Sequence, residues 1–357
     1  MAKKNKKNKK NKKNKLSSLI LLLFLTVVML STSTYAWFTS NRTVSIENID
    51  VQVATSSGIQ ISADGINWKT TLTANDIMPD DNGPAQYTTN TNQFPGSLTP
   101  VSTDGSVTSG KMNMFYGVVA ANKADQGKFY VSANKQTDTK GQTGFYIAFD
   151  FFIRLDESSK VYISPGSGVR WNGQNGADKK LQYAARMGFV NEGTVQVTAA
   201  ADTIQALNTG TTSWIWEPNA DGHTATGIQN GIEYYGISAN QLKVGYNGDG
   251  TVSDNPAYVE YVGIKEEIAE PGVYLGSTRS SSHFQTVTTA RTSVKYTLDP
   301  ESVTGVYQQF TDSQLGAGIT KIRAYMWIEG EDIECENNAS GTYVRYNLSL
   351  TLDGNEE

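Results

Sequence analysis

The sequence contains one cysteine, Cys335, in 357 residues. A single cysteine cannot form a disulfide within the chain, so the fold must be held together without that cross-link. Small exported domains often compensate for a limited core with several disulfides. This chain is long enough to bury a large core, either as one big domain or as one domain with a substantial insertion.

Histidine is almost as scarce, with only His223 and His283. Neither lies in a metal-ligand spacing such as H-E-x-x-H, and we expect both in exposed loops. Cys335 would need a histidine partner to act as a nucleophile, and no local signature supplies one. The sequence also lacks a G-x-S-x-G elbow, a phosphate-binding loop and a dinucleotide fingerprint. We therefore predict that the protein is not an enzyme and has no organic cofactor.

The first 36 residues have the layout of an export signal. Nine lysines alternate with asparagine between Lys3 and Lys15, and an apolar run follows from Leu19 to Leu30. Small and polar residues lead to Ala36, so we predict cleavage between Ala36 and Trp37 by a signal peptidase. The alternative is an uncleaved membrane helix, although the apolar run is shorter than the ~20 residues that span a bilayer. Both interpretations place the remainder of the chain outside the cell.

Removal of the export signal would change the net charge of the protein. The whole chain carries 30 Lys+Arg and 35 Asp+Glu, and loss of residues 1–36 leaves 21 basic residues and a net charge of −14. An acidic protein is a poor ligand for nucleic acid or anionic lipid, so we expect no nucleic-acid partner. The Lys-Asn run is better explained as the part of the signal that stays at the inner membrane face. One cysteine in an exported chain favours a Gram-positive bacterial surface or a secreted location.

The hydrophobic pattern after the signal is that of strands. Apolar and polar residues alternate in 44–53 and most regularly in 342–352, as in half-buried strands. Residues 145–155 are almost continuously apolar, which indicates a strand buried on both faces. With 33 glycines and frequent turn signals, the pattern predicts an all-β antiparallel sandwich in which the first and last strands share the core.

We expect one domain over residues 37–357, with two polar excursions. Residues 73–111 contain four prolines and many Thr, Asn and Ser residues, and this composition predicts a surface segment outside the core. Residues 199–290 form the second variable region, again rich in glycine turns.

Three acidic segments are candidates for a calcium site. Asp249 and Asp254 flank a glycine-rich turn, but an EF-hand register places Gly245 and Pro256 where carboxylates are required. A looser site through Asp249 and Asp254 remains open, as do sites at 80–81 and 329–336. The alternative for all three segments is a solvated acidic turn.

Exposed aromatic residues could stack on sugars and make the protein a surface adhesin or glycan-binding module. The candidates are Trp171, Trp214, Trp216, Tyr234 and Tyr235. Trp214 and Trp216 alternate, so both would lie on one face of a strand. Core packing is the more common fate of such a pair.

Both ends of the chain resemble a known family. Thr34-Tyr-Ala-Trp-Phe38, followed by Asn41-Arg-Thr-Val44, is similar to the start of the TasA/camelysin group, and 327–335 resembles a segment of exported proteins of that kind. The likeness is limited to about the first 60 and last 40 residues. It implies a Gram-positive surface or biofilm-matrix protein, a jelly-roll-like sandwich, and fibres in which the mature N-terminal segment adds a strand to the next subunit. The protease activity ascribed to camelysin is not implied, because no zinc pattern is present.

The residues themselves also suggest such an arm. Cleavage after Ala36 would leave an extended segment from Trp37 and Phe38 to Val44. Edge strands of a sandwich present unpaired backbone groups, to which an extended segment can add while its aromatic side chains fill pockets. The alternative is that Trp37 and Phe38 fold back on their own domain or lie at the membrane interface.

Overall fold

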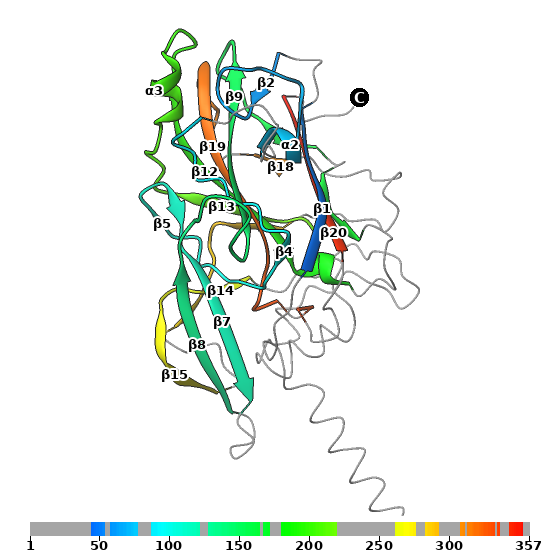
Figure 1. Cartoon of the computed structure of the whole chain (residues 1–357), viewed down its shortest axis with the longest axis vertical. Helices are drawn as coiled ribbons and strands as arrows, with labels where there is room; N and C mark the ends of the chain where they lie inside the picture. The colour runs from blue at the N-terminus through cyan, green and yellow to red at the C-terminus, as the bar shows by residue number, and fades with distance from the viewer. Residues whose placement is uncertain are drawn as a thin grey trace, which may run out of the picture.

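The structure is a computed structural model of the chain, and its elements are shown in Figure 1. It describes residues 44–53, 58–77, 87–121, 128–164, 167–171, 180–219, 261–275, 283–292, 308–310, 313–332, 334–335 and 343–352. The predicted signal or anchor at 1–36, the cleavage point at Ala36 and Trp37, and Phe38 lie outside these residues. No helix among the described residues has the length and apolar character needed to cross a bilayer.

The described chain is predominantly β, as predicted, and two sheets form its body. One has seven strands, of which five follow the order β18-β10-β20-β1-β3, while β11 pairs with β20 and β4 with β1. Its strands are β1 (Val44–Val53), β3 (Thr71–Thr73), β4 (Ser97–Leu98), β10 (Tyr162–Ile163), β11 (Gly168–Trp171), β18 (Gln308–Gln309) and β20 (Tyr343–Thr351).

The second sheet has six strands in the order β17-β13-β12-β19-β9-β2. They are β2 (Gln60–Ser62), β9 (Ile147–Leu155), β12 (Ala185–Val195), β13 (Ser213–Glu217), β17 (Ala290–Thr292) and β19 (Gly318–Ile328). The long antiparallel strands β12, β19 and β9 form its centre. The near-continuous apolar run therefore lies inside a sheet, as expected, since β9 is flanked by β19 and β2.

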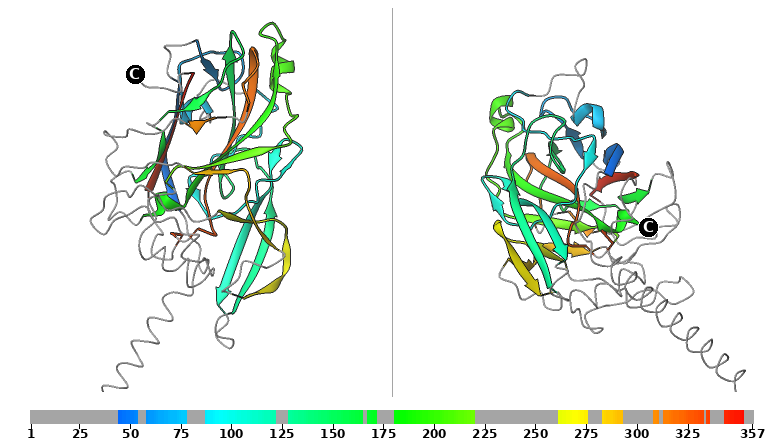
Figure 2. Two further views of the ribbon diagram at one scale, coloured as in Figure 1. Left: turned by 180° about the vertical axis from the view of Figure 1, so that it is seen from behind. Right: turned by 60° about the horizontal axis from the view of Figure 1, so that its bottom comes forward.

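Smaller elements complete the fold. A three-stranded sheet extends away from the two packed sheets in both Figure 1 and Figure 2. It contains β7 (Met114–Ala121), β8 (Lys128–Gln136) and β15 (Ile268–Leu275), and two strand pairs join β5 (Val107–Thr108) to β6 (Lys111–Met112) and β14 (Val262–Ile264) to β16 (Phe284–Thr286). The described helices are the short segments α2 (Ala74–Ile77), η2 (Leu181–Ala184) and α3 (Ala201–Gln205).

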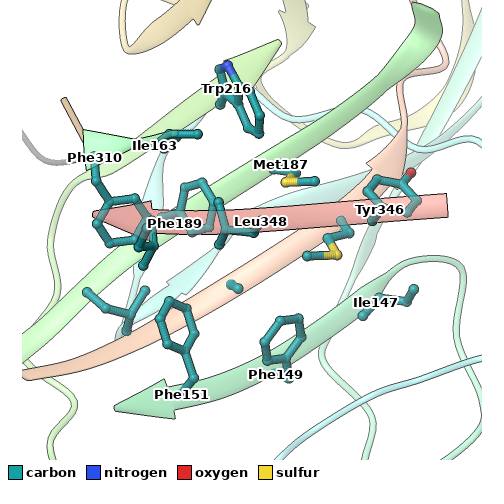
Figure 3. Close-up of a cluster of buried hydrophobic side chains, with 14 of the residues drawn as sticks. Ile147, Phe149, Phe151, Ile163, Met187, Phe189, Trp216, Phe310, Tyr346 and Leu348 are labelled. Carbon is teal, nitrogen blue, oxygen red and sulfur yellow. The ribbon is translucent and has the colours of Figure 1, made fainter. Parts of the chain in front are cut away.

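The main core lies between the two large sheets, which gives the body a sandwich-like arrangement. Alternate residues of β20 (Val344, Tyr346, Leu348 and Leu350) are buried in one cluster with residues of β9, β12, β13 and β19. Figure 3 shows side chains of β9 and β20 converging in this space. The period-two pattern of the last strand therefore correctly predicted which of its residues face the core.

The first and last described strands are neighbours, as the sequence predicted. Strands β1 and β20 pair in parallel from Ser45 opposite Tyr343 to Val53 opposite Leu350. Most other pairs are antiparallel, and β13 with β17 is a second parallel pair. Val44, expected as the end of a donor arm, pairs with Leu98 of its own chain.

The expectation that 73–111 is a surface excursion is wrong for the residues described there. Ile77, Leu98 and Val101 are fully buried, and so is the polar side chain of Asn92. Asn92 is accommodated because its amide donates to the Ile77 carbonyl and its carbonyl accepts the N–H of Asp150. Polar composition predicts exposure only when the polar groups lack internal partners.

We expect the replacement Leu348→Ala to lower the free energy of unfolding by about 2–5 kcal/mol, because it opens a cavity between the two sheets. Arg345, on the exposed face of the same strand, is the matched control. The variant Arg345→Ala should change stability by less than about 0.5 kcal/mol. Urea titration of both variants measures the difference, and equal effects would contradict the assignment of faces on β20.

Candidate functional site

Strand β19 carries two different faces, both of which are buried. Its apolar residues Ile322, Ala324, Met326 and Ile328 belong to the main core. The other face carries Lys321, Arg323, Tyr325 and Trp327 and continues into Glu329, and each of these side chains is less than a tenth exposed. We call these five residues, with their partners on neighbouring strands, the ionic layer.

Segment 87–115 and residues near β14 cover the ionic layer. Val101 exchanges main-chain hydrogen bonds with Ile328 and Gly330 at 3.0 and 2.9 Å. The N–H of Met112 donates to the hydroxyl of Tyr325 at 3.1 Å, and the guanidinium of Arg323 donates to the Thr91 carbonyl at 3.0 Å. Most of segment 87–115 was predicted to lie on the surface, yet it covers buried polar side chains. We call this segment the lid.

Arg323 is the centre of the first cluster in the layer. It lies directly opposite Asp150 in the β19–β9 ladder, and its Nη1 is 2.7 Å from Oδ1 of that residue. Its Nε and Nη2 donate to Oδ2 of Asp138 at 2.9 and 2.6 Å. Asp138 also accepts hydrogen bonds from the hydroxyls of Tyr146 and Tyr325 at 2.7 and 3.1 Å. One guanidinium therefore joins β19 to β9 and to the segment after β8.

Lys321 and Tyr87 complete the surroundings of Asp150. Nζ of Lys321 is 3.4 Å from Oδ2, and the hydroxyl of Tyr87 donates to the same oxygen. Burial alone would raise the pKa of Asp150, but Arg323 and Lys321 outweigh it and hold the pKa below its ordinary value. Burial would lower the pKa of Arg323, but the carboxylates of Asp150 and Asp138 keep it well above its usual value.

Arg186 on β12 is the centre of the second cluster. Its Nη2 is 2.6 Å from Oε1 of Glu217 on β13 and also donates to Asp332. Its guanidinium lies over the ring of Tyr261, 5.2 Å from the centroid. Burial opposes its charge, but Glu217 and Asp332 together raise the pKa of Arg186 above the usual value. This arginine remains a cation at any pH at which the protein is folded.

Glu329 joins the second cluster to the lid. Its Oε2 accepts hydrogen bonds from Nε1 of Trp327 at 3.0 Å and from the hydroxyl of Tyr261, while Oε1 accepts from the N–H of Glu331 at 3.0 Å. Complete burial raises the pKa of Glu329 to about 7, although these hydrogen bonds act in the opposite direction.

Glu192 is a further buried acid, located at a bulge in β12. The register with β19 shifts between Asn191 and Gly193, and Gly193 lies opposite Lys321. Glu192 accepts the N–H of Gly210 at 3.2 Å through Oε2, and Oε1 has no hydrogen-bond partner among the described residues. Burial raises the pKa of Glu192 to about 7, and the charge of Asp150 acts in the same direction.

The predicted calcium candidates have different outcomes. Asp249, Asp254 and 80–81 lie outside the described residues. The described acids of 329–336 do not form a solvated turn: Glu329, Glu331, Asp332 and Glu334 are all buried, and that expectation was wrong because Arg186 and main-chain N–H groups lie beside them. Across the described part of the chain, no group of three His, Cys, Asp or Glu side chains is arranged to hold a metal ion.

The aromatic candidates for glycan stacking also have different outcomes. Trp214 and Trp216 share one face of β13 and are buried in the main core, so packing is their role. Trp171 is partly exposed at the end of β11, and Tyr234 and Tyr235 lie outside the described residues. Cys335 is also buried in the main core.

His283 is paired with an acid. Its Nδ1 is 3.1 Å from Oε1 of Glu266, and its side chain is about one-third exposed. His223 lies outside the described residues.

Asp150, Arg186 and Arg323 were not predicted as site residues from the sequence. The available signal was a single charge within a strand that is otherwise apolar on both faces, as in Phe149-Asp150-Phe151. A charge at such a position must find a partner inside the protein. The partner cannot be identified from the sequence, because Arg323 is 173 residues away from Asp150.

Comparison with known proteins identifies no relative. No family model matches the chain, and the searches of curated proteins and of solved structures also found no match. The function must therefore be inferred from the structure alone. The structure shows a buried, hydrogen-bonded ionic layer that links the strands of the six-stranded sheet to the lid.

We expect Arg186→Met to lower the free energy of unfolding by about 3–5 kcal/mol, because Glu217 and Asp332 lose their buried cation. The control is Lys69→Ala, which removes an ion pair with Asp76 in which nearly half of the lysine side chain is exposed. That change should cost no more than about 1 kcal/mol. Similar losses in the two variants, measured by urea unfolding, would argue against the second cluster.

The pKa of Glu192 predicts a dependence of stability on pH. Its ordinary value is 4.5 and the folded value is about 7, so the folded state binds this proton more tightly than the unfolded state. The resulting stability is complete below pH 4.5 and is lost as the pH rises through about 7, by at most about 3 kcal/mol.

Urea unfolding between pH 4.5 and 7.5 should show this decline, with Glu329 contributing in the same direction. The variant Glu192→Gln should have a smaller slope, whereas the exposed control Glu157→Gln should retain that of the parent protein. Asp150 acts in the opposite sense and at lower pH, because its depressed pKa makes stability fall only when the pH falls below its ordinary value of 3.8. An unchanged slope in Glu192→Gln would show that Glu192 is not the buried acid that titrates.

Proposed function

We propose that the chain is an exported structural protein of the cell surface or extracellular matrix, with a jelly-roll-like sandwich, whose copies join into fibres through the N-terminal arm. The observation that supports it most directly is the position of β1. The export leader ends a few residues before Val44, and β1 then enters the large sheet beside the last strand. The mature N-terminus is thus attached directly to a long ladder in the body of the protein.

The pairing of Val44 defines the donated segment more closely. Because Val44 pairs with Leu98 of its own chain, the segment available for another copy is 37–43. It begins with Trp37 and Phe38, which would fill pockets on the acceptor while its main chain pairs with an edge strand.

The projecting three-stranded sheet offers such an edge. Strand β7 pairs with β8 along its whole length, and on its other side only Phe115 bridges, to Ser102, among the described residues. On that side, the main-chain groups of 116–121 have no strand partner within the part of the chain that the structure describes. Strand β15 at the opposite edge contains Pro271, which cannot donate a main-chain hydrogen bond and so makes that edge a poorer acceptor.

The competing function is an adhesin or glycan-binding module. Burial of Trp214 and Trp216 removes two of its five proposed stacking residues, whereas the pairing of Val44 within its own chain only shortens the donated segment to 37–43. The structural function is therefore the one we favour.

We expect deletion of 37–43 from the mature protein to abolish fibres seen by electron microscopy, while the monomer keeps its melting temperature. The matched control deletes 353–357, five residues at the other terminus, and should leave fibres unchanged. Mass spectrometry of extracellular protein should find Trp37 at the N-terminus. Fibres that persist without 37–43 would refute strand donation, and an intact Lys-Asn leader on extracellular protein would indicate an anchored monomer.

A further inference from the structure

Lys321 and Asp150 are an unusual pair for the interior of a sheet. They lie on the same face of adjacent antiparallel strands, one step apart on the diagonal, since Lys321 opposes Phe152 and Asp150 opposes Arg323. Their exposed fractions are 8% and 3%. Nζ lies 3.4 Å from Oδ2, so an amine and a carboxyl group are held together away from bulk water.

Apolar side chains and polar groups both surround the pair, and Nζ of Lys321 also donates to the Gln205 carbonyl at 2.9 Å. Tyr87, Phe152, Ile204 and Ile319 form a small buried cluster at this place, and the Tyr87 ring centroid is 5.7 Å from Nζ of Lys321. Such an environment restrains the two groups and keeps out competing water. Restraint of this kind can replace a large part of the entropy barrier for a reaction between them.

We propose that Lys321 and Asp150 condense to form an amide that covalently joins β19 to β9. One proton passes from the ammonium of Lys321 to Oδ2 of Asp150, which gives an amine and a carboxylic acid. Nζ attacks Cγ, a second proton passes from Nζ to Oδ2, and the Cγ–Oδ2 bond breaks as water leaves. The product is one amide N–H and one carbonyl, and no oxidant, reductant or activating group is consumed.

Neighbouring groups are placed to assist the attack and the loss of water. Nη1 of Arg323 donates to Oδ1 at 2.7 Å, where negative charge develops when Nζ attacks. The hydroxyl of Tyr87 donates to Oδ2, the oxygen that leaves.

The charges predict that the step is slow and that its product is favoured. Arg323 and Lys321 hold the pKa of Asp150 low, so the neutral pair is rare and its formation limits the rate. Condensation removes one buried cation and one buried anion, and Arg323 keeps Asp138 as its counterion. Removing a buried ion pair avoids a desolvation cost that the attraction between the charges often fails to offset. The amide is independent of fibre formation and would supply a cross-link in a chain that cannot form a disulfide.

Intact-mass spectrometry and peptide mapping of the purified folded protein, incubated at pH 7, test the proposal. We expect a loss equal to one water molecule, and a branched peptide that links the segments containing Lys321 and Asp150. The variant Lys321→Arg should retain the full mass, while the exposed control Lys160→Arg should lose water as the parent does.

Three outcomes would overturn the proposal. The first is a parent protein that retains its full mass after prolonged incubation. The second is a loss of water that persists in Lys321→Arg. The third is a loss that maps to one of the Asp-Gly pairs, which would indicate succinimide formation instead of a cross-link. Circular dichroism confirms that the variants fold, and the peptide map of the parent protein decides the question even where a variant does not.

Discussion

The structure depends on a charged face of a central strand being kept dry. Ionised groups inside a protein are tolerated only when they are paired and hydrogen-bonded. The row from Lys321 to Glu329 meets that condition through carboxylates of neighbouring strands and through a polar lid. Because the partners come from many parts of the chain, the layer can form only when the six-stranded sheet and its lid are both in place. A chain with a different strand order would therefore leave these buried charges without partners.

Much of the fold was predictable because alternation is a local property. The period of two identified β1 and β20, and the uninterrupted apolar run correctly placed β9 inside a sheet. The burial of Trp214 and Trp216 followed the ordinary preference of a paired aromatic strand face. In each case the neighbours along the chain carry the information, since the side chains of a strand alternate between its two faces.

The ionic layer was not predictable, because exposure of a polar residue is decided by distant partners. The acidic segment 329–336 and the lid at 87–115 have the composition of surface loops, yet the described acids of the first are buried and the second contains buried polar residues such as Asn92 and Gln93. Composition averages over residues, whereas burial depends on whether each polar atom finds a partner. Arg186 forms ion pairs with Asp332 and Glu217. Because Arg186 is far from the acidic segment in the sequence, the segment alone could not reveal this partner.

The layer also bears on how a chain with one cysteine is stabilised. A disulfide stabilises chiefly by restricting the unfolded chain, whereas a buried charge network acts only on the folded state. Removing one member leaves another charge without its counterion, so partial opening is costly. Such a network disfavours local opening of the sheet more than it raises the total stability. If copies join through their strand edges, as we propose, resistance to local opening is the more useful of the two properties.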